Sequence, residues 1–271
     1  MKRILSIALV MAVFASGLAF AQVKAKDGVY FAQDDAFGKT GWKDEVVVAV
    51  SGGKIVKVQW NGVANIAGAA DKKAYAAAGK YGMAKAAKAG EWDKQAAAAE
   101  AWLVKTQDVG FAKFDKDGKT DAITGASLTT KGFLALVNKA LASAPVAKGS
   151  YKDGWYYKEQ ADFDKNSGWK DTVLVTVVNG TIVDVLWNGI YKDATKKSKL
   201  VEAESGGYGM GKVAKKGEWN VQAKAVQDAI VKAGDPAKIA LKPDTTSDAV
   251  SGASIHLTAV VLAVEALKAA K

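Results

Sequence analysis

The chain has 271 residues, with 38 Lys and Arg against 28 Asp and Glu, and 49% of its residues are hydrophobic, a composition typical of globular proteins. It has no Cys and one His, which excludes disulfides, thiolate nucleophiles, zinc knuckles, iron–sulfur clusters, c-type haem and multi-histidine metal sites. Hydroxyls, carboxylates, amines, aromatic rings or an organic cofactor must therefore carry any chemistry.

Residues 1–21 have the pattern of a secretory signal peptide. Residues 2–3 form a positive n-region, residues 4–14 an apolar h-region, and residues 19–21 (Ala-Phe-Ala) a small-x-small cleavage site. An uncleaved anchor helix is the alternative, but Ser16-Gly17 interrupts a run already short for a bilayer. With no cysteine for a lipid anchor, we expect an exported protein that is periplasmic or extracellular, or peripheral to the membrane.

The rest of the chain is a tandem duplication. Matched blocks are offset by 126 residues at the first block and by 127 at all later ones. We expect one repeat at residues 22–146 and a second at residues 147–271, joined near Pro145. The matched blocks are Asp27–Tyr30 with Asp153–Tyr156, Gly41–Asp44 with Gly168–Asp171, Trp60–Gly62 with Trp187–Gly189, Tyr81–Met83 with Tyr208–Met210, Gly90–Trp92 with Gly217–Trp219, and Asp121–Ser127 with Asp248–Ser254.

Each repeat begins with a predicted β-hairpin. Residues 46–50 and 54–60 are two predicted strands on either side of a Ser-Gly-Gly turn in the first repeat. In the second repeat, Asn179-Gly180 separates the β-branched runs 172–178 and 181–187, the strongest short hairpin signal.

Two helices are predicted after each hairpin. The first spans about residues 84–105, and its buried stripe recurs in the second repeat. The last follows Gly-Ala-Ser, over about residues 128–141 and 255–270. The fold class is therefore α+β, two tandem repeats of a small antiparallel sheet covered by helices. The two stripes are Trp92, Ala96, Ala99 and Leu103, and Trp219, Ala223, Val226 and Ile230.

The repeated Asp-Ala-[Ile/Val]-[Thr/Ser]-Gly-Ala-Ser motif is the sharpest functional signal. Gly-Ala predicts a turn of little bulk, after which Ser127 or Ser254 would open a helix. Backbone N–H groups at a helix N-terminus favour a phosphate, and a serine there could contact or be esterified by a phosphoryl group. The alternative is that both serines only cap helices.

The motif resembles the flavinylation motif of FMN-binding domains. Such domains occur in the flavinylated subunits of the sodium-pumping NADH:quinone oxidoreductase and of the related Rnf complex, and in exported flavinylated electron-transfer proteins. The resemblance implies a phosphoester between FMN and the last motif hydroxyl, made from FAD by a separate magnesium-dependent flavin transferase. It implies two covalent FMN groups per chain, on Ser127 and Ser254. The implied recognition and phosphate-cradling positions are Asp121, Thr124, Gly125, Ala126, Asp248, Ser251, Gly252 and Ala253.

Other retained residues have two interpretations. The paired tryptophans and the Tyr-Gly-Met blocks could contact a flavin ring, or they could pack in the core. Core packing is favoured for Trp92 and Trp219, because they lie on the helical stripe. Glu91 and Glu218 are interpreted as first-turn helix charges. His256 has no counterpart in the first repeat. The lysines, including Lys72 and Lys73, are interpreted as a solvated surface that could steer acidic partners, with no face for nucleic acid.

The resemblance implies an exported electron carrier, in the manner of extracellular electron transfer, rather than a stand-alone enzyme. It would relay electrons between a membrane-bound, quinone-linked donor and an extracytoplasmic acceptor, because a flavin carries one or two electrons while the protein positions it. Two alternatives remain open: non-covalent FMN binding, and a non-redox envelope module for an anionic or carbohydrate ligand.

Overall fold

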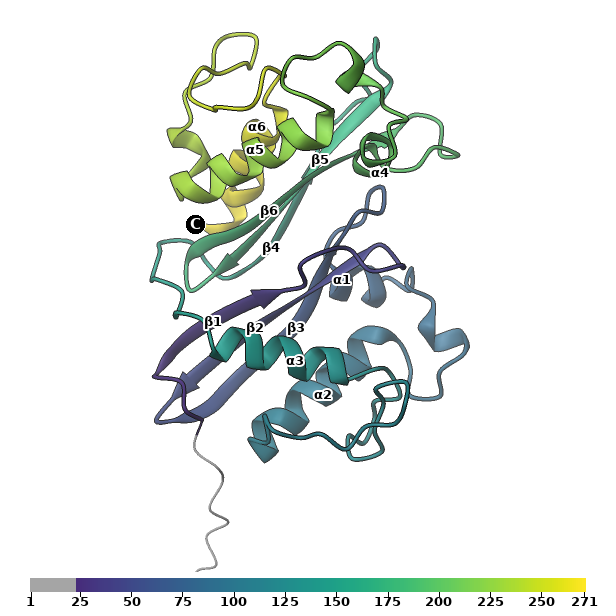
Figure 1. The fold of residues 1–271 in the computed structure, drawn as a ribbon, viewed down its shortest axis with the longest axis vertical. Helices are drawn as coiled ribbons and strands as arrows, with labels where there is room; N and C mark the ends of the chain where they lie inside the picture. Colours follow the sequence, from purple (N-terminus) through teal and green to yellow (C-terminus); the bar gives the residue numbers. More distant parts are fainter. Residues whose placement is uncertain (1–22) are drawn as a thin grey trace, which may run out of the picture.

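The computed structural model describes residues 23–271, and the predicted signal peptide lies outside them. These residues form two units, each a three-stranded antiparallel sheet with helices on one face (Figure 1), which confirms the predicted α+β class. The first unit contains β1 (Gly28–Gln33), β2 (Trp42–Ser51), β3 (Lys54–Ala64), α1 (Lys72–Ala77), η1 (Met83–Lys85), α2 (Trp92–Thr106) and α3 (Lys131–Leu141). The second contains β4 (Gly154–Glu159), β5 (Trp169–Val178), β6 (Thr181–Tyr191), α4 (Lys199–Glu204), η2 (Met210–Lys212), α5 (Trp219–Ala233), η3 (Pro236–Lys238), α6 (Thr258–Ala266) and η4 (Leu267–Ala270).

Both predicted hairpins are present. Val46 pairs with Trp60 across β2 and β3, and both side chains are buried in the core of the first unit. In the second hairpin Asn179 and Gly180 both adopt positive φ, 50° and 76°, as a two-residue type I′ turn requires. The strands run several residues further than predicted, and β1 and β4 add a third strand that alternation alone did not identify.

The stripe on the first long helix is confirmed, but its predicted start is wrong. Ala96, Ala99 and Leu103 are fully buried where α2 packs on β3. The helix begins at Trp92 rather than near residue 84, because Gly90 has a left-handed φ of 88° and the Glu91 carboxylate then accepts the Trp92 N–H. Residues 83–85 form only a single 3₁₀ turn.

The helices that follow the serine motif begin later than predicted. α3 starts at Lys131 and α6 at Thr258, so neither Ser127 nor Ser254 is a cap. The cap positions are Thr130 and Leu257, and neither makes a side-chain capping hydrogen bond. The N-cap interpretation of the two serines is therefore wrong, and so is the prediction that they sit at a helix N-terminus.

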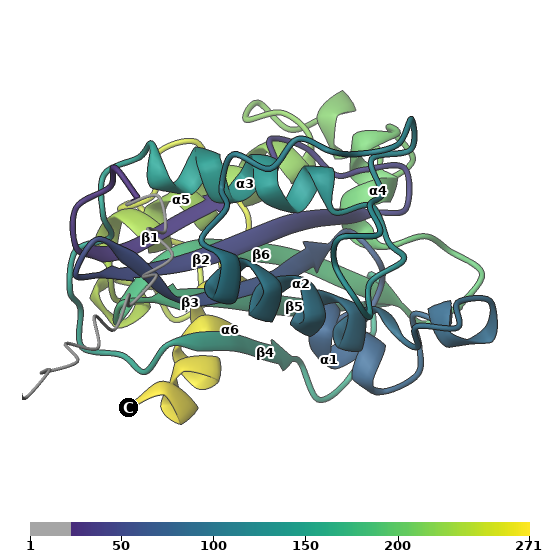
Figure 2. The same ribbon diagram turned by 90° about the horizontal axis from the view of Figure 1, so that it is seen from below.

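The two sheets face each other, and the helices form the outer layers (Figures 1 and 2). Val63 of β3 joins the buried apolar cluster of the second unit, which contains Leu186 of β6. At this interface Glu45 of β2 is fully buried, and its Oε2 accepts the Trp155 Nε1–H at 2.6 Å and the Thr176 hydroxyl at 3.3 Å. The connection between the units runs from the end of α3 to β4. Over residues 23–271, none of the helices has the length and apolar character needed to cross a membrane.

Candidate functional site

A pocket lies beside the motif serine in each unit. The pocket of the first unit has a volume of about 690 Å³ and that of the second about 710 Å³. Seven lining residues are identical at matched positions in the two pockets, so the duplication preserves a site as well as a fold. These positions are Asp44 and Asp171, Trp60 and Trp187, Lys72 and Lys199, Tyr81 and Tyr208, Met83 and Met210, Trp92 and Trp219, and Ser127 and Ser254.

A buried glutamine positions each serine. Gln95 Oε1 accepts both the Ser127 N–H at 2.8 Å and the Ser127 hydroxyl at 3.1 Å. Gln222 accepts the same two groups of Ser254 at 2.8 and 3.2 Å. Both glutamines are fully buried on the long helix, while each serine borders its pocket. Each hydroxyl therefore points its proton at an amide oxygen and keeps its oxygen lone pairs available at the pocket.

The glycine of each motif is required by the turn. Gly125 has φ of 87° and Gly252 has φ of 92°, in the left-handed region that favours glycine. A Cβ at Gly125 would lie 3.3 Å from the Ala98 Cβ, and one at Gly252 would lie 3.2 Å from the Ala225 Cβ. The turn therefore packs closely against the long helix, which brings the serine within reach of the glutamine.

The remaining motif residues lie outside the pocket linings. Asp121 and Thr124 are exposed, as are Asp248 and Ser251. Asp248 pairs with Lys242 Nζ at 2.7 Å. Ala126 and Ala253 are half-buried against the core, and motif residues Ile123 and Val250 are buried and anchor the loop. The structure thus brings only the serines of the predicted set to the pockets.

Each pocket also contains a buried lysine paired with an aspartate, which sequence reasoning missed. Lys72 Nζ lies 2.7 Å from Asp44 Oδ1 and 4.3 Å from the centroid of Trp92. Lys199 Nζ lies 2.8 Å from Asp171 Oδ1. The prediction that Lys72 belongs to a solvated surface is wrong, because its ammonium is paired and lies over an aromatic face. The signal was present in the sequence, since both members of the pair recur at an offset of 127.

The aromatic residues serve the core and the pocket together. Trp60 stacks on Phe133 with centroids 4.8 Å apart, and its Nε1–H donates to Asp44 Oδ2 at 3.0 Å. Trp92 is 2% exposed, which confirms its place in the core, and it also borders the pocket. Tyr81 is half-buried and also lines the first serine pocket. These aromatic residues can therefore both pack in the core and contact a bound ring.

Glu91 organises the loop at the pocket entrance. Its carboxylate accepts the N–H groups of Met83 at 3.0 Å and Trp92 at 2.9 Å. Burial pushes the pKa of Glu91 up, but these backbone donors together hold it below its ordinary value. Glu218 does the same for the second loop. Both carboxylates therefore act as caps and loop anchors rather than as catalytic acids.

The second pocket differs from the first near its serine. His256 lines it, and its Nδ1 lies 2.5 Å from the Asp244 carbonyl oxygen. The corresponding residue in the first unit is Thr129. The two pockets are therefore related but not chemically identical.

Comparison with known proteins gives the following results. The family model described as the FMN-binding domain matches residues 41–142, which lie within the first unit. A solution NMR structure of a Clostridium thermocellum protein is 44% identical over 44% of this chain and 91% of that one, with a TM-score of 0.35. A crystal structure of a Clostridium perfringens protein is 20% identical over 44% of this chain and 88% of that one, with a TM-score of 0.32. No curated protein matches the chain.

Proposed function

Since residues 41–142 match the family model of the FMN-binding domain, we propose that this chain is an exported electron carrier with one FMN esterified to Ser127 and another to Ser254. It takes electrons from a membrane-bound, quinone-linked donor and passes them to an extracytoplasmic acceptor. The family match supports flavin binding in the first unit. The second FMN, the covalent bonds, the location and the partners are the further content of the proposal.

One observation carries the proposal: both motif serines open onto pockets with the same seven matched side chains. Volumes of about 690 and 710 Å³ lie in the range of cofactor sites. A Cβ added at Gly82, which borders the first pocket, would meet no atom within 4 Å, so the backbone there is open to a ring. The aromatic rings, the thioether and the paired ammonium therefore suit a large planar heteroaromatic group.

Attachment requires a hydroxyl whose oxygen is free to form a bond to phosphorus. With a flavin transferase, the Ser127 oxygen would displace AMP from FAD, which would form a serine–FMN phosphoester and AMP and release the hydroxyl proton. Gln95 holds the hydroxyl by its proton, which fixes the oxygen at the pocket mouth. A bound flavin supplies one- and two-electron chemistry, and the chain's own residues keep it in place.

The buried lysine of each pocket would act on the bound ring. Lys72 offers a cationic N–H donor inside an aromatic wall, where water does not screen it fully. Asp44 keeps this ammonium in one position and neutralises it in the absence of the ring. Lys199 and Asp171 do the same in the second unit.

Co-expression with a flavin transferase tests the proposal. We expect a fluorescent protein band on a denaturing gel and two FMN additions in the intact mass. Ser127→Ala and Ser254→Ala should each remove one addition, and the double variant should remove both. Fluorescence lost on denaturation would indicate hydrogen-bonded FMN, and no flavin at all, with the transferase active on another substrate, would overturn the proposal in favour of a non-redox module.

Replacing the positioning glutamine should separate flavinylation of the two sites. Gln95→Leu leaves the Ser127 N–H and hydroxyl without their acceptor, so we expect slow and incomplete flavinylation at Ser127 and full occupancy at Ser254. Gln222→Leu should show the reverse, and each variant serves as the control for the other. Site occupancy is read by peptide mass spectrometry over time, with circular dichroism to check the fold. Equal loss at both sites in either variant would contradict the assigned role.

A further inference from the structure

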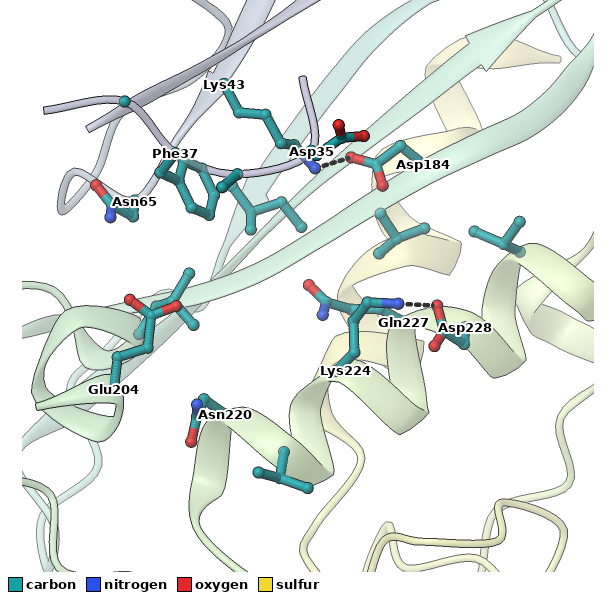
Figure 3. Close-up of a pocket in the computed structure, with 17 residues that line it drawn as sticks. Asp35, Phe37, Lys43, Asn65, Asp184, Glu204, Asn220, Lys224, Gln227 and Asp228 are labelled. Carbon is teal, nitrogen blue, oxygen red and sulfur yellow. Dashed lines mark hydrogen bonds and ion pairs between the residues drawn. The ribbon is translucent and has the colours of Figure 1, made fainter. Parts of the chain in front are cut away.

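A third pocket lies between the two units. It has a volume of about 720 Å³ and is bounded by the loop after β1, by β6 and by one side of α5 (Figure 3). Phe37 from the first unit faces Asn220 and Lys224 from α5 across this cleft. We refer to it below as the inter-unit cleft.

The inter-unit cleft shares walls with both serine pockets. Leu186, Leu200 and Asn220 line the cleft, while their sequence neighbours Trp187, Lys199 and Trp219 line the second serine pocket. On the other side Lys43 lines the cleft and Asp44 lines the first serine pocket. A molecule in the cleft would therefore lie beside the second serine pocket, with Lys43 next in sequence to Asp44 of the first.

The cleft lining on the second unit differs from the first unit at two matched positions. In the first unit Lys73 Nζ bonds Glu100 Oε1 at 2.6 Å. The second unit has Leu200 and Gln227 at these two positions, and both line the cleft. The second unit therefore places one apolar and one uncharged polar side chain in the cleft where the first unit has an ion pair.

The charges in the cleft disfavour an anionic ligand. Lys43 lies 3.7 Å from Asp184, and Lys224 is paired with Asp228, so each cleft lysine has a carboxylate beside it. Glu204 adds a further carboxyl whose pKa is raised by burial. A neutral molecule is therefore a better match than an anion.

The polar groups suit a ligand that both accepts and donates hydrogen bonds. Asn220 Oδ1 is buried and has no hydrogen-bond partner within residues 23–271. Gln227 Oε1 accepts the Trp187 N–H at 2.7 Å, and its Nε2 is a donor. Quinone carbonyls need donors, hydroquinone hydroxyls need acceptors, and the floor provided by Phe37 and Leu200 suits the ring.

We propose that the inter-unit cleft binds a small neutral quinone that exchanges two electrons with the attached flavins, an assignment that rests on the proposed function. Reduced flavin gives up two electrons and two protons, and the quinone takes up two of each to become the hydroquinone. The electrons cross the shared side-chain wall, and the protons pass through solvent. The cleft thus couples the chain to a diffusible carrier.

Binding can be measured on the chain without flavin. The probe is menadione, added to isotope-labelled protein and followed by backbone NMR shifts and tryptophan quenching. We expect shifts at Phe37, Leu200 and Asn220 with little change at Gly82 and Gly209. A sulfonated naphthoquinone should bind about tenfold or more weakly, because the cleft carboxylates repel it. Shifts confined to the serine pockets, equal binding of the sulfonate, or binding of riboflavin without menadione would each overturn the assignment.

The duplication supplies a matched pair of variants. Leu200→Lys with Gln227→Glu rebuilds the ion pair of the first unit inside the cleft, and it should weaken menadione binding about tenfold or more. Lys73→Leu with Glu100→Gln makes the reverse change on the first unit and should leave binding unchanged. Unchanged binding in the cleft variant would contradict the proposal. Flavinylation of that variant should stay at two FMN groups, so loss of quinone binding and failure of flavin attachment are distinguishable.

Discussion

Glu45→Gln is expected to make the chain more stable than the native protein at pH 8.5, with little difference at pH 5. Burial, followed by the charge of Asp184, raises the pKa of Glu45 to about 8 from an ordinary value of 4.5. The folded chain therefore binds a proton that the unfolded chain releases between these two pH values. The gain should be on the order of a few kcal/mol at the higher pH.

The sign follows from proton linkage. Well below pH 4.5 the Glu45 carboxyl is protonated in both the folded and the unfolded chain, so its burial costs no stability by ionisation. As the pH rises from 4.5 toward 8, the carboxyl ionises in the unfolded chain but stays protonated in the folded chain. The free energy of unfolding therefore decreases over this range. Glutamine keeps an acceptor for Trp155 Nε1–H and cannot ionise.

Urea unfolding at pH 5, 7 and 8.5 measures the effect as a difference between native and variant chains. Thr172→Val, at the matched position of the second unit, is the control and should give a difference that does not vary with pH. A pH-independent difference between the native chain and Glu45→Gln would mean that Glu45 is not protonated in the fold.

Asp171→Ala is expected to destabilise the second unit by about 3–5 kcal/mol, because it leaves the Lys199 ammonium buried without its partner. Both side chains of this pair are 9% exposed, so water offers little compensation. The double variant Asp171→Leu, Lys199→Met should recover most of the loss, since no charge remains to be buried.

Exposed ion pairs provide the comparison. Lys268→Ala removes the pair with Glu265, where the side chains are 64% and 40% exposed, and should cost under about 1 kcal/mol. Chemical unfolding of the flavin-free chain gives these values without interference from a cofactor. A double variant no more stable than Asp171→Ala would show that the pair, rather than the unpaired charge, determines the cost.

The parts of the fold that follow local rules were predictable. Asn179-Gly180 specifies its own turn, and the stripe from Trp92 to Leu103 specifies one buried helix face. The helix starts were not predictable from periodicity, because Gly90 and Glu91 end the preceding loop by backbone conformation and by a carboxylate bond. Periodicity also failed to locate the start of α3, which begins at Lys131 rather than at Ser127.

The sequence was enough to predict the serines of the site, but not the residues that hold the serines and line the pockets. Gln95 and Lys72 recur in both repeats, but repetition does not say that one residue accepts from Ser127 and the other faces Trp92. Those contacts join segments that are distant in the sequence, which only the tertiary fold brings together. The inter-unit cleft was outside the reach of sequence reasoning, because it depends on how two complete units pack.

The contact of Glu45 with Trp155 is made between unlike halves. Thr172 stands at the position that matches Glu45, and Val29 at the position that matches Trp155. Two copies of the first unit joined in the same way would therefore bury two Glu45 carboxylates with no indole N–H to donate to them. Covalent connection near Pro145 gives the halves a high effective concentration that dilution does not reduce. The chain thus joins two unlike halves in a single polypeptide, and dilution would not separate its two pockets.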